Sequence, residues 1–265
     1  MELEINVVDA FTDKVFAGNP AAVIITPSVL SALLMQSIAM ENNLSETAFL
    51  VLLKPGEYTI RWFSPITEIA FCGHATLAAA KVIFTQQPQL QTITFSAKAV
   101  GTFMVSQTPG GKIQMNFPNT KPHKVDVIPA SLLAGLSIEP LEVYQNGQAY
   151  FVLCKSQAEL LAVERNNDLL KQLAPFDVVV TCQSESTKYD FVSRYFWPAN
   201  GGDEDPVTGS IHTGLAPFWA ERLAKNELIA YQASSRGGVV DCTVAGDRVL
   251  ISGHARHYLT GTITV

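Results

Sequence analysis

Two short runs of small and polar residues, Cys72-Gly73-His74 and Thr208-Gly209-Ser210, each begin an apolar segment of helical character. The first backbone N–H groups of a helix lack partners within the helix and carry the positive end of its dipole. Two such helix starts that face one another would bind an anion, and glycine lets a ligand approach the backbone closely. Neither run contains lysine, so a small carboxylate fits better than a phosphate. The competing interpretation is that both glycines only allow close helix–strand packing.

The two runs belong to an internal repeat. Residues 61–74 read Arg-Trp-Phe-Ser-Pro, a loop, then Cys-Gly-His, and residues 194–210 read Arg-Tyr-Phe-Trp-Pro, a loop longer by three residues, then Thr-Gly-Ser. The second spacing continues as far as Gly101 and Gly237. An ordered series of matches at steady spacing indicates duplicated folding units. We therefore expect two similar lobes, with the chemistry where matching loops meet.

Composition limits the class of protein. The 265 residues are 48% hydrophobic and 16% charged, which is typical of an ordered globular protein with one large or two modest domains. A net charge of −6 with scattered Lys and Arg argues against a nucleic-acid partner. The four cysteines lack CxxC spacing and no signal segment opens the chain, so free thiols in the cytoplasm are expected. The apolar runs are too short to span a membrane.

Alternating and apolar patterns place the chemical residues on elements. Residues 3–11 and 21–25 predict a β-hairpin with a turn at 18–20, and residues 28–40 predict a helix capped by Ser28. Glu46 stands just before the apolar strand 49–53. Residues 73–84 are rich in alanine and nearly uncharged, and a helix that is apolar on all sides should be buried. The first lobe is therefore predicted as several strands around a central helix.

The second half repeats this plan. Strands are expected at 142–154, 177–181, 191–196 and in the tail 258–265, and a charged helix at 157–173. Residues 208–223 predict the second central helix, in which Pro217 bends the helix or shifts its first turns. Residues 119–127 are the best linker, which gives an N-terminal lobe of residues 1–120 and a C-terminal lobe of residues 121–265. The final strand is free to return to the first lobe.

Five motifs resemble the signatures of the phenazine-biosynthesis PhzF-like isomerase family. They keep the order found in the family and span nearly the whole chain: Asp9-Ala10-Phe11-Thr12, Phe16-Ala17-Gly18-Asn19-Pro20-Ala21-Ala22-Val23, Asn43-Leu44-Ser45-Glu46-Thr47-Ala48-Phe49, Cys72-Gly73-His74-Ala75-Thr76-Leu77-Ala78 and Glu204-Asp205-Pro206-Val207-Thr208-Gly209-Ser210. Accidental agreement of five ordered motifs is improbable. The chain is identified as a member of this family by resemblance.

The resemblance implies an α+β fold of the diaminopimelate-epimerase type, with two similar lobes, each a β-sheet curled around a central helix, and an active site in the cleft between them. It also implies a homodimer, a small-molecule carboxylate substrate, and no metal or organic cofactor. The site residues that it implies are the acid/base carboxylate Glu46, its polar partners His74, Asp205 and Ser210, and the backbone amides of Gly73 and Gly209 that hold the substrate.

The predicted function is that of a cofactor-independent isomerase acting on a small unsaturated or amino-acid-like carboxylate. A carboxylic acid in an apolar cleft can take a proton from one carbon and return it to another carbon on the same face. Glu46 would move the proton, while His74 and Asp205 orient the substrate. Taken one at a time, these residues are more typical of surface or capping positions. Only their motif context favours catalysis, and Glu46 lies outside both aligned runs of the repeat.

Two other functions stay open at this point. Amino-acid racemases and epimerases of the related fold use one thiol from each lobe, and Cys72 would be one such base. The repeat pairs Cys72 with Thr208, which cannot act as a thiolate. A Cys72–His74 pair is disfavoured because helix residues two apart point away from each other, although a helix start would lower the pKa of the thiol. The third alternative is a metabolite-binding protein without turnover.

Arginines near the repeat are expected to support the site. Arg61 and Arg194 stand on matching strands, where we favour a structural role over binding of a carboxylate. Arg236 follows a turn that resembles the family pattern, except that Ala233 replaces a common glycine, and it is expected to support the cleft.

Overall fold

The computed structural model describes all residues from Met1 to Val265, and the chain divides into two compact units. Unit 1 comprises residues 1–116 and 252–265, and unit 2 comprises residues 117–251. The predicted limits place the first boundary at residue 120, close to this division. The final strand, by contrast, belongs to unit 1. No helix is long and apolar enough to cross a membrane.

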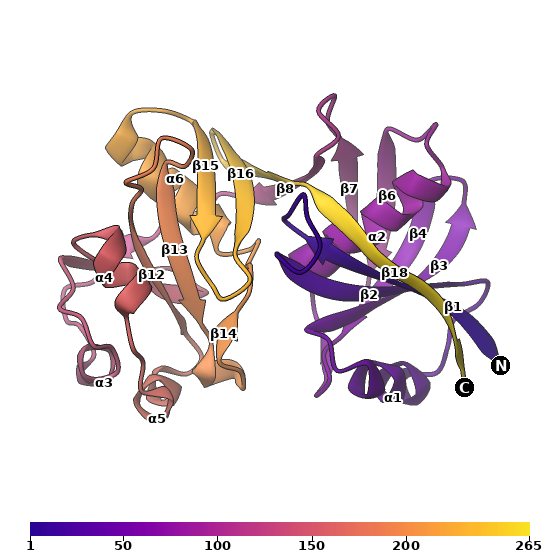
Figure 1. The fold of residues 1–265 in the computed structure, drawn as a ribbon, viewed down its shortest axis with the longest axis horizontal. Helices are drawn as coiled ribbons and strands as arrows, with labels where there is room; N and C mark the ends of the chain where they lie inside the picture. Colours follow the sequence, from indigo (N-terminus) through magenta and orange to yellow (C-terminus); the bar gives the residue numbers. More distant parts are fainter. The chain divides into compact units, whose positions relative to one another are not determined.

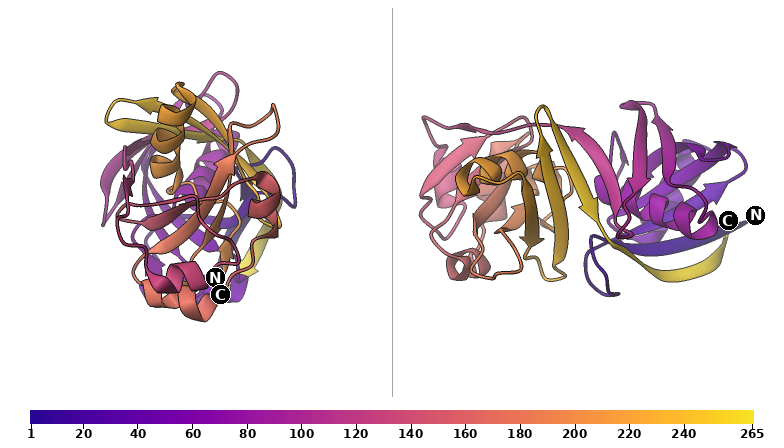
Figure 2. Two further views of the ribbon diagram at one scale, coloured as in Figure 1. Left: turned by 90° about the vertical axis from the view of Figure 1, so that its left-hand side faces the viewer. Right: turned by 90° about the horizontal axis from the view of Figure 1, so that it is seen from above.

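Unit 1 contains most of the strands that surround the first central helix. Its elements are β1 (Glu2–Ala10), β2 (Asn19–Thr26), α1 (Ala32–Asn42), β3 (Glu46–Lys54), β4 (Glu57–Phe63), β5 (Glu68–Ile69), α2 (Gly73–Gln86), β6 (Thr92–Ala97), β7 (Gly101–Gln107) and β18 (Ala255–Thr264), with β8 (Ile113–Pro118) leading out of the unit. β18 runs antiparallel to β1 from Glu2 opposite Thr264 to Ala10 opposite Ala255, so the two termini lie side by side (Figure 2).

Unit 2 repeats the order of unit 1. Its elements are β9 (His123–Lys124), α3 (Ala130–Ala134), β10 (Glu142–Gln145), β11 (Ala149–Leu153), α4 (Gln157–Ala162), α5 (Asn167–Leu170), the 3₁₀ helix η1 (Lys171–Leu173), β12 (Asp177–Gln183), β13 (Phe191–Phe196), the 3₁₀ helix η2 (Pro198–Asn200), β14 (Glu204–Asp205), α6 (His212–Leu223), β15 (Glu227–Gln232) and β16 (Gly238–Ala245), with β17 (Arg248–Gly253) leading back.

The strand pairings of the two units correspond one to one. In unit 1, β1–β2 is antiparallel, β2–β3 parallel, β3–β4 antiparallel, β4–β6 parallel and β6–β7 antiparallel. In unit 2, the same sequence of pairings is β10–β11, β11–β12, β12–β13, β13–β15 and β15–β16. Helices α2 and α6 lie at matching places in this order. The predicted α+β fold of two similar lobes is therefore confirmed.

The central helix of unit 1 is buried because it has almost no polar surface. Every residue of α2 from Gly73 to Phe84 is buried except Lys81, and the helix packs against β1, β2, β3 and β18 (Figure 1). Small side chains such as Ala75, Ala78 and Ala79 have no exposed surface, which lets the surrounding strands approach the helix closely. The polar groups at its first turn are therefore held between a packed helix and a packed sheet.

The second central helix begins later than the sequence predicts, and Pro217 lies inside it. The prediction that helix begins at Thr208 is wrong, since α6 begins at His212 and residues 209–211 form a turn. Pro217 has no N–H to donate to the carbonyl of Thr213, and that carbonyl instead accepts a hydrogen bond of 3.1 Å from the backbone N–H of Thr120. The turn before α6 is of the 3₁₀ type, in which each N–H donates to the carbonyl three residues earlier. His212 N–H, for example, donates to the Gly209 carbonyl.

Three other elements differ from the sequence prediction. The helix expected to begin at Ser28 is capped by Ser31, whose hydroxyl accepts from the backbone N–H of Leu34. The single helix expected over 157–173 is broken into α4, α5 and η1, because Val163 is extended and Asn166 caps a new helix start. The strand expected over 142–154 is a hairpin, in which the Asn146 side chain closes the turn by accepting from two backbone N–H groups.

Gly214 in α6 is a packing requirement that stability measurements can test. A Cβ atom at this position would lie 2.6 Å from the ring of Phe151, whereas a Cβ at Gly147 would meet nothing within 4 Å. Because Phe151 is fully buried, we expect Gly214→Ala to lower the free energy of unfolding by about 1–3 kcal/mol in urea denaturation. Gly147→Ala should be nearly neutral. Equal stability of the two variants would contradict this packing.

Candidate active site

Glu46 is held at the edge of the packed core of unit 1. It is the first residue of β3 and lies opposite Ala21 in the parallel strand β2. The next residues, Thr47 and Ala48, are buried, which fixes the direction in which the Glu46 side chain leaves the strand. That side chain is only 13% exposed. The prediction that a carboxylate stands where this strand begins is confirmed.

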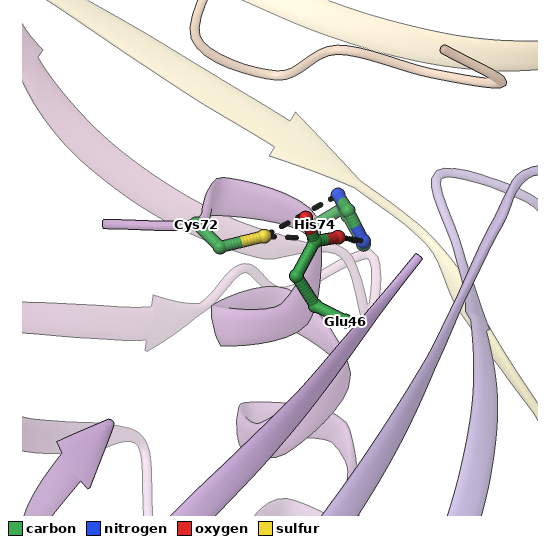
Figure 3. A group of neighbouring side chains, drawn as sticks. All are labelled: Glu46, Cys72 and His74. Atoms are coloured by element: carbon green, nitrogen blue, oxygen red, sulfur yellow. Dashed lines mark hydrogen bonds and ion pairs between the residues drawn. The ribbon is translucent and has the colours of Figure 1, made fainter. Parts of the chain in front are cut away.

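His74 is the immediate neighbour of Glu46. It is the second residue of α2, and its side chain is 7% exposed. Its Nε2 lies 2.8 Å from Oε2 of Glu46 (Figure 3). Oε2 makes no aligned hydrogen bond, so this contact is mainly one of charge and proximity. Two groups that can exchange a proton are thus adjacent and shielded from water.

Asn19 bonds the other nitrogen of the imidazole ring. It is fully buried as the first residue of β2, and its Nδ2 lies 3.1 Å from Nδ1 of His74. Because an amide nitrogen donates, Nδ1 accepts, and the proton of the neutral ring is assigned to Nε2, which faces Glu46. Sequence analysis interpreted Asn19 only as a turn residue. Its place in the motif Gly18-Asn19-Pro20 was the available signal for a role at the site.

The pKa of His74 depends on its burial and on the neighbouring Cys72 and Glu46 side chains. Burial lowers the pKa of the imidazole, but the Cys72 sulfur and the Glu46 carboxylate outweigh burial and raise that pKa well above 6.5. A protonated ring carries N–H at both nitrogens, so that state requires the Asn19 amide to turn its oxygen toward Nδ1. The charge on His74 and the orientation of Asn19 are therefore coupled.

Cys72 contacts His74, contrary to the expectation that the two side chains point apart. Cys72 is the N-cap of α2 and is extended, with φ −139° and ψ 114°, so the spacing rule for residues inside a helix does not apply. Its sulfur lies 3.5 Å from Nδ1 and 3.9 Å from Nε2 of His74. The predicted low pKa is also wrong. Burial, together with the Glu46 charge, raises the pKa of the Cys72 thiol to about 11.

The arrangement of these donors does not match a zinc site. Sγ of Cys72, a ring nitrogen of His74 and a carboxylate oxygen of Glu46 all lie within 4.8 Å of one another. A metal bound by imidazole lies in the ring plane, along the lone pair of one nitrogen. The sulfur is nearly equidistant from both ring nitrogens, so it lies along neither lone pair.

Three further predicted residues, Asp205, Gly209 and Ser210, lie in unit 2. Asp205 ends β14, and its carboxylate accepts from the Thr208 hydroxyl while its carbonyl accepts from Gln232. The hydroxyl oxygen of Ser210 accepts a hydrogen bond of 2.9 Å from Gln148 Nε2. Gly209 is buried in the turn before α6. The convergence of these residues with Glu46 and His74 on one cleft stays a prediction.

Both central helices leave backbone donors unused at their starts. The N–H groups of Gly73 and His74 make no hydrogen bond within the protein, and the same holds for Gly209 and Ser210. Gly73 begins α2 as predicted, whereas Gly209 and Ser210 precede α6 by one turn. The N–H groups of Gly73 and Gly209 are the donors that the sequence assigned to a substrate carboxylate.

Arg61 and Arg194 have structural partners. Arg61 forms a bidentate pair with Glu68 at 2.7 Å for each bond. Arg194 forms a bidentate pair with Glu204 and also donates to the backbone carbonyls of Leu160, Leu161 and Val163. The structural interpretation of both arginines is therefore confirmed.

A surface hollow of about 500 Å³ lies elsewhere in unit 2. It is lined by Val163, Glu164, Arg165, Asn167 and Asp203. It contains none of the predicted site residues and no adjacent acid–base pair, so the chemistry favours the Glu46–His74 group as the active site.

The family of the chain follows from comparison with known proteins. The profile of the family described as phenazine biosynthesis-like protein matches residues 8–261. An uncharacterised isomerase of Halalkalibacterium halodurans is 44% identical over 257 residues, 96% of each chain. An uncharacterised isomerase of Pseudomonas aeruginosa is 43% identical over 263 residues, 99% of each chain. The crystal structure of a PhzF-family phenazine biosynthesis protein of Enterococcus faecalis superposes with a TM-score of 0.94 at 38% identity, covering 100% of both chains.

These matches define the class as that of PhzF-like enzymes of the isomerase type. The chain belongs to the phenazine biosynthesis-like protein family, as its motifs predicted.

The hydrogen bonds of Arg194 lead to a stability prediction. Replacement of Arg194 by Met leaves Glu204 without its bidentate partner and removes the side-chain donor of the Leu161 and Val163 carbonyls, so we expect a loss of about 2–3 kcal/mol in the free energy of unfolding. Arg61→Met, which breaks a more exposed pair, should cost less than about 1 kcal/mol. Urea denaturation of both variants measures the difference, and an equal loss would contradict the assignment.

The raised pKa of Cys72 leads to a reactivity prediction. A pKa of about 11 in place of 9.0 reduces the thiolate fraction at pH 7 about 100-fold, and the thiol is also buried. Iodoacetamide should therefore modify Cys72 very slowly in the native protein, and faster as the pH rises toward 11. Mass spectrometry of the Cys72 peptide, with urea-unfolded protein as the control, measures the rate. Rapid native modification at pH 7 would contradict the assigned pKa.

Proposed function

We propose that this protein is a cofactor-independent isomerase that moves a proton within a small unsaturated or amino-acid-like carboxylate. Glu46 is the acid/base group, and His74 and Asp205 are its polar partners. The observation that carries the proposal is the 2.8 Å contact between Glu46 and His74, both largely buried at the start of an apolar helix. Family membership supports the isomerase class.

The Glu46–His74 contact suits proton transfer at carbon. A carboxylate shielded from water can remove a proton from a substrate carbon and, in its protonated form, return that proton elsewhere on the same face. His74, held by Asn19, presents an N–H to the same region and can donate to a substrate oxygen or nitrogen as charge develops there. One carboxylate then serves both halves of the reaction.

Backbone donors support recognition of an acid. The N–H groups of Gly73 and Gly209 have no partner in the protein. Gly73 begins α2 and Gly209 lies in the turn just before α6, and the positive end of a helix dipole favours an anion. In this proposal they bind the substrate carboxylate, with Ser210 as a further donor. The same hypothesis includes binding of the substrate in a cleft between the two lobes. It also includes assembly of the protein as a homodimer.

Cys72 is a poor candidate for one base of a two-base racemase. Its raised pKa of about 11 keeps it a thiol at neutral pH, and its repeat position in unit 2 is Thr208. We therefore assign Cys72 to packing beside the imidazole. Its buried sulfur contacts both nitrogens of the His74 ring.

Substitution of Glu46 tests the proposal. Candidate acids incubated with the enzyme in deuterium oxide should gain deuterium at carbon in those turnovers in which Glu46 exchanges its proton with solvent before returning it. Glu46→Gln should reduce this rate about 1,000-fold or more, because the amide keeps the shape but cannot move a proton. The incorporation is measured by proton NMR. Glu41→Gln, an exposed change on α1, is the matched control and should retain the wild-type rate.

Two other results would redirect the interpretation. Full activity of Glu46→Gln together with loss in Cys72→Ala would replace the proposal with a thiol-dependent racemase. A carboxylate that copurifies with the protein but never exchanges its protons would indicate a metabolite-binding protein.

A further inference from the structure

Glu46 has a counterpart in the second unit. Glu46 is the first residue of β3 and pairs with Ala21 of the parallel strand β2. Asp177 is the first residue of β12 and pairs with Ala149 of the parallel strand β11. The two acids therefore begin matching strands at the same register.

The neighbouring pairs confirm this match. Thr47 lies opposite Phe63, and Val178 lies opposite Phe196. Phe63 and Phe196 are corresponding residues of the sequence repeat. The interpretation that Glu46 lies outside the repeat is thus wrong, since strand register extends the repeat to Glu46 and Asp177.

Asp177 is a buried acid with both oxygens occupied. It is 8% exposed, and burial raises the pKa of its carboxyl. Its Oδ2 accepts from the hydroxyl of Tyr195 at 2.6 Å, and its Oδ1 accepts from Nδ2 of Asn200 at 2.7 Å. Each oxygen of this buried acid is thus committed to a side chain of the same unit. The acid therefore orients the groups that donate to it.

A chain of hydrogen bonds connects Asp177 to Ser210. Tyr195 donates to Asp177, and the Tyr195 oxygen accepts from Nε2 of Gln148 at 3.0 Å. The same nitrogen donates its second hydrogen to Oγ of Ser210 at 2.9 Å. All four residues belong to unit 2. Ser210 occupies the repeat position of His74.

The direction of each bond in this chain is determined by the acid. Because the hydrogen of Tyr195 goes to Asp177, the Tyr195 oxygen can only accept from Gln148. The Gln148 amide must therefore present its NH₂ group, which also faces Ser210. Since the Ser210 oxygen accepts from Gln148, its own hydrogen is not used there and points to another partner. No protein acceptor bonds that hydrogen, so it is available to a ligand.

The acid that begins the strand is connected differently in the two units to the residue at position 74 or 210. In unit 1 the long Glu46 side chain reaches His74 directly, at 2.8 Å. In unit 2 the acid is shorter by one methylene and Ser210 is smaller than histidine. Tyr195 and Gln148 fill the space between the acid and the residue at the helix start.

We propose that Asp177, Tyr195 and Gln148 are positioning residues that hold the Ser210 hydroxyl as a hydrogen-bond donor to the substrate. This inference rests on the proposed function, because it assigns the substrate as the acceptor. The acceptor is an oxygen or nitrogen atom that carries negative charge in the substrate or gains it during proton transfer. Unit 1 then supplies the moving proton, and unit 2 supplies a fixed donor.

A double-variant experiment tests the role of Gln148. Gln148→Glu replaces the donor with an acceptor, so Ser210 turns its hydrogen toward residue 148 and away from the substrate. We expect kcat for deuterium incorporation to fall about 10- to 100-fold, close to the loss in Ser210→Ala. The double variant should lose no more than Ser210→Ala alone. Gln148→Met, which removes the amide at similar volume, should cause a smaller loss.

Gln183→Glu is the matched control. It adds the same charge on β12, at an exposed position, and should leave kcat unchanged. A merely structural role of Gln148 would make the losses of Gln148→Glu and Ser210→Ala multiply in the double variant, and that outcome would overturn the proposal.

A second measurement needs no substrate. The side-chain amide of Gln148 gives two proton resonances in a ¹⁵N-correlated NMR spectrum of the full chain. Tyr195→Phe should move one of them and Ser210→Ala the other, because each hydrogen has its own acceptor. If neither resonance moves, the hydrogen-bond chain is wrong. If both resonances move but the wild-type protein exchanges deuterium into no acid, the series of hydrogen bonds is supported and the proposed isomerase function is wrong.

Discussion

The burial of α2 is the constraint on which the rest of unit 1 depends. A helix that is apolar on nearly all sides must be enclosed by strands, and it leaves only its first turn for polar groups. His74 lies on that turn, and Glu46 and Asn19 each begin a strand that packs against the helix. The same packing that stabilises the unit therefore concentrates an acid, an imidazole and an amide at one place with little water.

Duplication of this arrangement explains how one fold holds two different polar groups. The strand pairings of the two units correspond, so an acid is the first residue of both β3 and β12 at the same register. In unit 1 the acid meets His74 directly, whereas in unit 2 Asp177 is saturated by Tyr195 and Asn200. The same scaffold therefore carries different side chains in its two units. In our proposal Glu46 of unit 1 moves a proton, and the acid of unit 2 orients a hydrogen-bond donor.

Sequence patterns predicted the repeat, the buried helix and the position of Glu46, because hydrophobic periodicity and motif order reflect local rules. They failed where a single tertiary contact decides the outcome. The helix predicted from Thr208 begins at His212, and the Thr213 carbonyl, which Pro217 leaves without a donor inside α6, accepts from Thr120, far away in sequence. The Cys72–His74 contact depends on the extended backbone of an N-cap, and the Asp177 counterpart of Glu46 becomes visible only from strand register.

The central claim is that one carboxylate removes and returns the same proton. The most direct test uses a substrate acid labelled with deuterium at the carbon that loses its proton, turned over in ordinary water and analysed after a single turnover. We predict that part of the deuterium appears at the carbon that gains the proton, because a shielded carboxylate exchanges with water more slowly than it transfers. Complete loss of the deuterium label to solvent, in both the wild type and Cys72→Ala, would contradict the claim that Glu46 alone removes and returns the same proton.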